Sequence, residues 1–447
     1  MALGVRLSPE LLPGGMTEAD VATIAGEFHK RGLIDFVNLT LGTDYNAHKI
    51  IGAMHEAAGY EVPHAAPVRA ALDLPVLVTG RFRTLEEADQ VIHEGAADLV
   101  ALTRAHIADP DLVAKTVAGQ PEAVRPCIGC NHGCVGGLNT MGRMGCTVNV
   151  AVGAEAALSE DLLQKVAEPK LVLVVGGGPA GLEAARVAAL KGHKVILAEA
   201  AGSLGGAINA ARRAPRRAGI GDITEWLERE VYRLGVDVRL GTYVDASDID
   251  EIAPDAVIVA TGSLPRMDGL QHRSPGQVAS GMERRHVVSS HDLLLENSNR
   301  NWGSSALVYD DAGHYEAVAA AEFLIERGLS VTFATGLSSF APGLETSLSA
   351  EPALERLAKG GKFRFIPYAR LDAVGESHAS VSTRYGGAAE EIAADTVVFV
   401  SHNRGNRDLV DALEGWSGHV AVVGDARSPR YLQTAIREGH MAARAIA

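Results

Sequence analysis

All four cysteines of this 447-residue chain lie within one short stretch, and these side chains are the group best suited to chemistry. They are Cys127, Cys130, Cys134 and Cys146, with the spacing C-x2-C-x3-C-x11-C. Thiolates are preferred ligands of iron–sulfur clusters and of zinc. Because zinc sites more often use paired C-x2-4-C knuckles, three close thiols with a distant fourth favour a [4Fe–4S] cluster and one-electron transfer. Zinc and unrelated or disulfide-bonded thiols are the alternatives.

A glycine-rich turn after an apolar run predicts a dinucleotide site. Leu171–Val175 is the apolar run, and a helical pattern follows the turn. The glycines of the G-x-G-x-x-G motif are Gly176, Gly178 and Gly181. They permit a tight turn and let a diphosphate approach the helix N-terminus. Glu199 ends the next predicted strand, where a carboxylate can hold ribose hydroxyls, and Gly205 follows it.

Two later segments extend this prediction. The segment VIVATG contains Thr261 and Gly262, and the segment VVGD contains Gly424 and Asp425. Both resemble strand-and-turn segments of flavoproteins that have two dinucleotide-binding folds. We therefore expect FAD, or an ADP moiety, in the first fold.

A second strand–turn–helix unit, residues 305–335, is predicted inside the first. Asp310, Ala312 and Tyr315 occupy its three glycine positions. The carboxylate would face a diphosphate, and the large ring would replace the glycine that permits close helix–strand packing. Tight NAD(P)H binding is therefore not expected, unless the altered loop still binds nucleotide through Gly313.

Residues 1–120 alternate short apolar strands with helical patterns, which predicts a parallel sheet. The predicted strands are Gly4–Leu7, Ile34–Leu39, Val76–Thr79 and Leu99–Leu102. The predicted helices are Thr17–Arg31, Pro67–Leu72, Thr84–Glu94 and Pro110–Ala118. In a β/α barrel the strand ends carry the active site, and the last two loops often hold a phosphate. Residues placed for a phosphate are Gly80, Arg81, Thr103 and Arg104, although polar residues are also ordinary at strand ends.

Four segments together resemble the NADH:flavin oxidoreductase (old yellow enzyme) family: GVRLSP, PVLVTGRFRTLEEAD, ADLVALTRAHIADPDL and RPCIGCN. The resemblance is to the branch of trimethylamine dehydrogenase, the dimethylglycine-type demethylases and 2,4-dienoyl-CoA reductase. It implies that Arg6 lies against the pyrimidine end of FMN and that the four strand-end residues bind the FMN phosphate. It also makes Asp44 a candidate for contacting a cationic amine, because the amine dehydrogenases carry an acidic residue in the corresponding loop.

The sequence departs from this family in one respect. A closed β/α barrel needs eight strands, whereas four are predicted here, and GVRLSP resembles the fifth strand of the family. A second subunit could supply the missing half of the barrel, the sequence could be truncated, or FMN binding could be lost.

We therefore expect an α/β chain with the C-terminal half of a TIM (β/α) barrel, an iron–sulfur loop and two nested Rossmann-like domains. The FMN-type half-barrel is expected over residues 1–120, and the cluster loop and linker over residues 121–165, with a helix from residue 151. The FAD or ADP domain is expected over residues 166–300 and 395–447. The inserted second domain, with its degenerate glycine motif, is expected over residues 301–394.

These features predict an iron–sulfur flavoprotein oxidoreductase that demethylates or dehydrogenates an N-methylated amine or amino acid. Electrons would pass through the [4Fe–4S] cluster to an electron-transferring flavoprotein, because the second nucleotide motif is altered. One alternative is NAD(P)H-dependent reduction of an enoate or a 2,4-dienoyl-CoA. The other is a non-catalytic electron-transfer subunit of a split enzyme.

Composition narrows the partners and the compartment. The net charge of −14 is spread along the chain without a basic stripe, which argues against nucleic acid and anionic membranes as partners. No apolar run is long enough to span a bilayer, and the first residues lack the features of a signal peptide. With reduced cysteines, these features predict a cytoplasmic protein.

Overall fold

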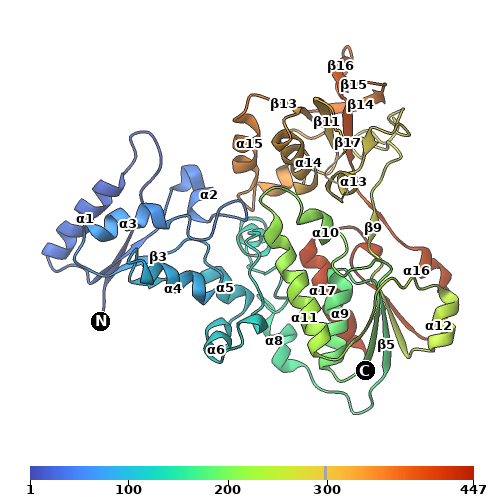
Figure 1. Ribbon diagram of the computed structural model, residues 1–447, viewed down its shortest axis with the longest axis horizontal. Coiled ribbons are helices and arrows are strands. Elements are labelled where there is room, and N and C mark those ends of the chain that lie inside the picture. The colour runs from blue at the N-terminus through green and yellow to red at the C-terminus, as the bar shows by residue number, and fades with distance from the viewer. Residues whose placement is uncertain (296–299) are drawn as a thin grey trace.

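A half-barrel, two nucleotide-binding folds and a cysteine-rich segment make up the computed structural model, which describes residues 1–295 and 300–447. Figure 1 shows the half-barrel in blue on the left, the first nucleotide-binding fold in green and red at the lower right, and the inserted second fold in orange above it. The cysteine-rich segment, residues 127–146, lies where these three bodies meet.

Four parallel strands form the half-barrel in the order β1-β2-β3-β4, as the alternating pattern predicts. The strands are β1 (Gly4–Leu7), β2 (Phe36–Leu39), β3 (Val76–Val78) and β4 (Leu99–Val100). The helices are α1 (Glu18–Lys30), α2 (Ala47–Ile50), α3 (Val62–Ala70), α4 (Leu85–His93), α5 (Thr103–Ala108) and α6 (Leu112–Val117). Val37, Val76 and Val78 are fully buried because helices pack over the sheet. Helix α5 was not predicted, and it puts Thr103 and Arg104 in a first helical turn.

The cysteine-rich segment folds as a π-helical turn over His132–Gly136 and a short helix, α7 (Gly137–Met141). Its Ile128 joins the hydrophobic core of the first nucleotide-binding fold. The helix expected from residue 151 is shorter than predicted, with α8 (Glu155–Leu158) and a 3-10 turn over Glu160–Leu162. The left-handed backbone of Gly153, with φ 74°, prevents an earlier start.

A five-stranded parallel sheet in the order β19-β8-β5-β6-β7 forms the first nucleotide-binding fold. Its strands are β5 (Leu171–Val175), β6 (Lys194–Ala198), β7 (Asp237–Arg239), β8 (Ala256–Val259) and β19 (His419–Val422). Its helices are α9 (Pro179–Leu190), α10 (Ile208–Ala211), α11 (Asp222–Arg233), α12 (Ala246–Ile252), α16 (Asp408–Ala412) and α17 (Leu432–Ala445). The chain returns to this sheet with β19 after completing the inserted fold, so the two folds are nested.

The inserted fold has its own five-stranded parallel sheet, in the order β10-β17-β11-β12-β13. Its strands are β10 (Val287–Val288), β11 (Ser305–Asp310), β12 (Ser330–Thr335), β13 (Phe363–Ile366) and β17 (Thr396–Val400). Its helices are α13 (Ser290–Leu295), α14 (Tyr315–Glu326) and α15 (Ala350–Ala358). An antiparallel sheet shares a core with it: β14 (Ala369–Val374), β15 (His378–Thr383) and β16 (Glu390–Ala393). Two segments connect the two folds, and they pair with each other as the antiparallel strands β9 (Ser263–Leu264) and β18 (Arg404–Gly405).

A buried ion-pair network fixes the linker on the first fold. The Arg186 guanidinium, 1% exposed, donates to Glu183 at 2.8 Å and to Glu160 of the linker at 2.7 Å. His440 of α17 lies 2.8 Å from the other oxygen of Glu183. These contacts hold α9, α17 and the linker together.

No helix among the described residues has the length and apolar character needed to cross a bilayer.

Candidate functional site

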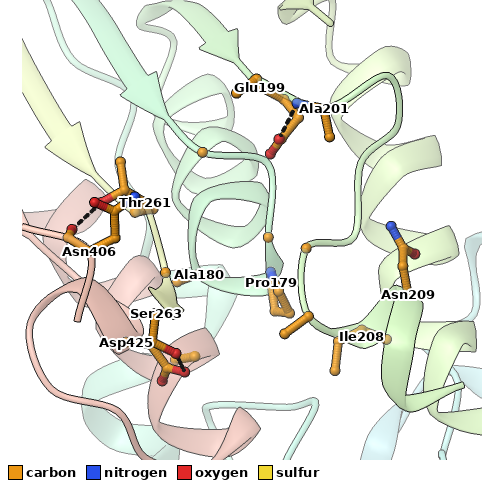
Figure 2. A pocket seen from close by; sticks show the side chains of 18 of the residues that line it. Pro179, Ala180, Glu199, Ala201, Ile208, Asn209, Thr261, Ser263, Asn406 and Asp425 are labelled. Carbon is orange, nitrogen blue, oxygen red and sulfur yellow. Dashed lines mark hydrogen bonds between the residues drawn. The ribbon is translucent and has the colours of Figure 1, made fainter. Parts of the chain in front are cut away.

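A cavity of about 1010 Å³ opens at the carboxyl ends of β5, β6 and β8 (Figure 2). Its volume lies at the upper end of the roughly 300–1,000 Å³ typical of ligand sites, which suits an elongated dinucleotide. The structure brings six of the predicted residues together in its wall: Gly176, Gly178, Glu199, Thr261, Gly262 and Asp425. Gly181, Gly205 and Gly424 support the wall from behind or beside it.

The β5–α9 turn needs its glycines for packing. A Cβ on Gly181 would lie 1.8 Å from the carbonyl oxygen of Gly176, whose own φ is 106°. Gly178 is the N-cap of α9, and a Cβ there would meet nothing closer than 3.9 Å. Gly205, with φ 112°, donates its N–H to the carbonyl of Gly177 in this turn at 2.9 Å. The turn therefore leaves the N-terminus of α9 open to an anion.

Two carboxylates lie at opposite sides of this turn (Figure 2). Glu199 accepts N–H bonds from Gly177 at 2.6 Å and from Ala201 at 2.7 Å, which fixes it at the end of β6. Asp425 accepts the hydroxyl of Ser263 at 3.0 Å and follows Gly424, whose φ is 62°. A ligand that spans the turn would have an acidic group near each end.

Two polar groups of this cavity, Ser263 and Asn406, were not predicted from the sequence. The Thr261 hydroxyl donates to the Asn406 carbonyl at 2.7 Å, across 145 residues of chain. Both groups come from the segments that cross between the two folds, where β9 pairs with β18. No local motif marks such a crossing.

The turn of the inserted fold is occupied by one of its own side chains. Asp310, at the end of β11, is fully buried and accepts N–H bonds from Ala312 at 3.0 Å and Gly313 at 2.8 Å. These are the donors that a nucleotide phosphate would use in a functional loop. Burial raises the pKa of Asp310 to about 7, because two N–H bonds do not replace its lost hydration.

The same turn is also covered. A Cβ on Gly313 would lie 2.5 Å from Leu337 and 3.3 Å from Pro342, so neighbouring side chains fill the space in front of that glycine. Tyr315 begins α14 and is 8% exposed, with the Arg217 guanidinium 3.7 Å from its ring centroid. The residues of this turn therefore do not fit a dinucleotide diphosphate.

The strand ends of the half-barrel surround a buried carboxylate that sequence reasoning missed. Glu61, 3% exposed, accepts the Thr79 hydroxyl at 2.6 Å. Burial raises its pKa, and the nearby charges of Arg6 and Arg104 oppose that rise. Arg6 itself donates to the Thr40 hydroxyl at 2.9 Å. Two predicted arginines thus meet at this edge of the sheet.

A group of guanidinium ions lies beside the same strand ends. Burial lowers the pKa of Arg81, and the positive charges of Arg83 and Arg104 lower it further. Nε of Arg81 is buried without a hydrogen-bond partner among the described residues, and the Arg81 backbone is left-handed, with φ 61°. Gly80, with φ 144°, accepts the N–H of Gly59 at 2.7 Å. A phosphate would relieve this repulsion, so the group fits an FMN phosphate.

Asp44 opens a 3-10 turn, Asp44–Asn46, on the loop after β2. Its side chain is exposed. Nearby Asn46 is buried and donates to the Glu10 carbonyl at 2.8 Å, which anchors the turn. Asp44 is therefore held on an ordered loop at the carboxyl end of the sheet.

The distant fourth cysteine is brought back to the other three by close backbone contact. Gly145 donates its N–H to the Gly133 carbonyl at 2.8 Å, and a Cβ on Gly133 would lie 3.1 Å from Cα of Cys146. All four thiols are free and partly buried. The eleven-residue gap in the spacing therefore closes into one loop.

Hydrogen-bond donors lie at each of the four sulfur atoms. The Gly129 N–H points at Cys127 at 3.5 Å, and the Thr147 hydroxyl lies 3.3 Å from the sulfur of Cys130. Backbone N–H groups of Val135 and Val148 serve Cys134 and Cys146. Such donors suit the sulfurs of an iron–sulfur cluster.

Burial raises the pKa of Cys134 to about 11 and that of Cys146 to about 12, so a bound cation would be needed to hold them as thiolates. The described residues contain no group of three or more His, Cys, Asp or Glu side chains arranged to hold a metal ion. In a four-iron cluster each thiolate binds a different iron. The donor set fits such a cluster by its chemistry.

Two family profiles match the chain. Residues 1–123 match the NADH:flavin oxidoreductase / NADH oxidase family, and residues 170–414 match the pyridine nucleotide-disulphide oxidoreductase family. The second match covers more than half of the chain, so the chain belongs to the pyridine nucleotide-disulphide oxidoreductase family; the first match covers its N-terminal segment. The family resemblance inferred from GVRLSP and the three later segments is thereby confirmed.

Several named proteins are similar over most of this chain. A probable N-methylproline demethylase of Rhizobium meliloti is 35% identical over 90% of the chain and 58% of its own length. An N,N-dimethylglycine/sarcosine dehydrogenase of Chromohalobacter salexigens is 32% identical over 93% of the chain and 60% of its own length. An NADH oxidase of Thermoanaerobacter brockii is 31% identical over 97% of the chain and 65% of its own length. The chain thus spans about three fifths of these relatives.

Solved structures agree over the whole chain. A 6-hydroxypseudooxynicotine amine oxidase of Pseudomonas geniculata N1 superposes with a TM-score of 0.90, at 27% identity, over 100% of this chain and 67% of its own. A histamine dehydrogenase of Rhizobium sp. 4-9 gives 0.89 at 26% identity, over 100% of this chain and 66% of its own. A 2-naphthoyl-CoA reductase gives 0.86 at 25% identity, over 99% of this chain and 64% of its own. The α/β fold predicted from the sequence is therefore confirmed.

Proposed function

We propose that this chain is the larger part of an iron–sulfur flavoprotein that oxidises an N-methylated amine or amino acid. The single observation that carries the proposal is the turn of the inserted fold. There the Asp310 carboxylate accepts the backbone N–H groups that would otherwise bind a phosphate, and Leu337 covers Gly313. The diphosphate of NAD(P)H would therefore have no binding site in that fold. This favours the substrate over NAD(P)H as the source of the reducing equivalents.

The half-barrel would hold FMN, which supplies a two-electron acceptor for the substrate. Arg6 would bind the pyrimidine end, and Gly80, Arg81, Thr103 and Arg104 would bind the phosphate. The unpartnered Nε of Arg81 and the repulsion among the nearby arginines support this role. The described sheet gives β1 and β4 one strand neighbour each, so the remaining barrel strands would come from polypeptide outside this sequence, on the same or another chain.

Asp44 would attract the cationic amine, because its exposed carboxylate stands on an ordered loop at the carboxyl end of the sheet. Its exposure keeps the attraction modest and sensitive to salt. We expect Asp44→Asn to raise the KM for the amine several-fold with little change in kcat. Asp73→Asn, at another exposed carboxylate of the same half-barrel, should leave both unchanged.

Cys127, Cys130, Cys134 and Cys146 would hold a [4Fe–4S] cluster, which passes electrons singly to an electron-transferring flavoprotein. The N–H groups directed at the sulfurs support this assignment. Replacing Cys130 by alanine should remove iron and acid-labile sulfide from the purified protein. Unchanged iron content in that variant would contradict the cluster.

We favour FAD over ADP in the first nucleotide-binding fold. A second cavity of about 260 Å³ adjoins the first, and Ile208, Asp425 and Tyr431 line both. It reaches Cys130 and His132 of the cysteine-rich segment. An ADP would end at the diphosphate, whereas a flavin ring would extend into this space. Chromatography of the nucleotide released by denaturation distinguishes the two.

Similarity to an NADH oxidase and to a 2-naphthoyl-CoA reductase supports a second function, NAD(P)H-dependent reduction of an enoate or a dienoyl-CoA. Anaerobic stopped-flow absorbance of the flavin-loaded protein tests both. Bleaching by sarcosine or N-methylproline, with NADPH inert, is the expected result. Bleaching by NADPH would overturn the first proposal in favour of the second. A protein that binds no FMN and bleaches with neither would instead be a non-catalytic electron-transfer subunit.

A further inference from the structure

Asn131 joins the cysteine-rich segment to the half-barrel. It follows Cys130 directly, is 1% exposed, and adopts a left-handed backbone with φ 55°, which asparagine tolerates better than most residues. Its Nδ2 donates to the Ile51 carbonyl at 2.8 Å, and its Oδ1 accepts from Nη1 of Arg104. One buried amide therefore ties together the loop after Cys130, the loop after β2 and the start of α5.

The Arg104 guanidinium depends on this amide for its position. Asn131 is the only hydrogen-bond partner of its side chain among the described residues. The positive charge of Arg104 contributes to the lowered pKa of Arg81, so the two cations repel each other. Without the amide, repulsion would move the Arg104 cation away from its present place.

That place is beside the cysteine-rich segment. The guanidinium of Arg104 contacts the side chain of Asn131, and Asn131 directly follows Cys130 in the chain. A fixed cation beside a partly buried cluster favours whichever state carries more negative charge. Reduction of a cluster adds one electron, so such a cation raises its reduction potential.

We propose that Asn131 is a positioning residue that holds Arg104 beside the cysteine sulfurs and thereby raises the reduction potential of the cluster. The inference rests on the cluster of the proposed function. In the step concerned, the oxidised cluster gains one electron from an external reductant, and no bond is made or broken. Through Arg104, the phosphate end of the flavin site and the cluster share one cation.

The test is a dithionite titration of the iron-loaded full chain, followed by electron paramagnetic resonance. Asn131→Gly removes the amide and tolerates the left-handed backbone, and Asn131→Asp keeps the side-chain shape but neutralises Arg104. Arg104→Gln removes the cation. Asn139→Ala is the matched control, because this exposed asparagine of the same segment donates only to the Thr346 carbonyl, at 2.9 Å.

We expect a lower potential in both Asn131 variants and in Arg104→Gln, and an unchanged potential in Asn139→Ala. The double variant Asn131→Gly/Arg104→Gln should match Arg104→Gln alone, because Asn131 acts through Arg104. A wild-type potential in either iron-loaded Asn131 variant would overturn this inference and leave the proposed function intact. Absence of iron from the wild-type chain would overturn the proposed function, and this inference with it.

Discussion

Replacing Asp310 by asparagine should remove a pH dependence from the stability of the inserted fold. Burial raises the pKa of Asp310 to about 7, and N–H bonds from Gly313 and Ala312 oppose that rise only in part. The unfolded-state value is about 3.9. The folded chain therefore holds more protons between about pH 4 and 7, so the free energy of unfolding falls as the pH rises through this window. Three units at ~1.4 kcal/mol each give a fall of roughly 4 kcal/mol.

The asparagine keeps the acceptor oxygen for both N–H groups, but its NH2 replaces Oδ2, which has no partner among the described residues. An unsatisfied buried donor costs about 1–3 kcal/mol. The wild type has already lost about 1.5 kcal/mol of this stability at pH 5. Asp310→Asn should therefore be less stable than the wild type by up to about 1.5 kcal/mol at pH 5, and more stable by about 1–3 kcal/mol at pH 8.

Urea unfolding at the two pH values measures this reversal, with the fluorescence of Trp302 as the probe, since that side chain is 5% exposed in the core of the inserted fold. Asp372→Asn, at a partly exposed carboxylate of the same fold, is the control and should show no reversal. If the wild type and Asp310→Asn lost stability equally between pH 5 and 8, the reasoning about the occupied turn would be refuted.

Two further predictions concern the first nucleotide-binding fold. Gly181→Ala would place a Cβ 1.8 Å from the Gly176 carbonyl oxygen and should abolish copurification of the adenine nucleotide. Gly202→Ala, whose Cβ would meet open space, is the control and should keep the bound nucleotide. The absorbance spectrum of each purified protein measures the nucleotide. Arg186→Ala would remove the guanidinium partner of the buried Glu183 carboxylate, leaving His440 beside it, and should lower the free energy of urea unfolding by about 3–5 kcal/mol. Arg407→Ala breaks an ion pair with Asp411 in which both side chains are exposed, at 51% and 66%, and should cost less than about 1 kcal/mol; equal losses in the two arginine variants would contradict the buried network.

Local patterns predicted the elements that a short window contains. The apolar run before Gly176 became β5 with the predicted bounds, and Gly4–Leu7 became β1 in the same way. The altered glycine motif at Asp310 predicted a defective turn before its geometry was known. Helix α5 was missed because its six residues follow a short strand directly, with no side-chain cap at Leu102 to mark its start.

Contacts between distant segments had no such signal. The sequence showed a carboxylate at Asp310 that would face a diphosphate, but only the folded turn showed it accepting the N–H groups of Ala312 and Gly313. The pairing of Thr261 with Asn406 spans 145 residues, and nothing near either residue indicates the other.

The sequence by itself determined the family resemblance, through four short segments. It also determined the parallel α/β architecture and the set of four cysteines, because spacing and periodicity are properties of neighbouring residues. The tertiary structure decided which charges meet. It brought Arg104 to Asn131 and the cysteine sulfurs, and it gathered Arg81 and Arg83 beside them. Electrostatic interactions weaken with distance and are screened over about 10 Å, and burial depends on which segments pack together. Their balance at each site therefore depends on packing rather than on order along the chain.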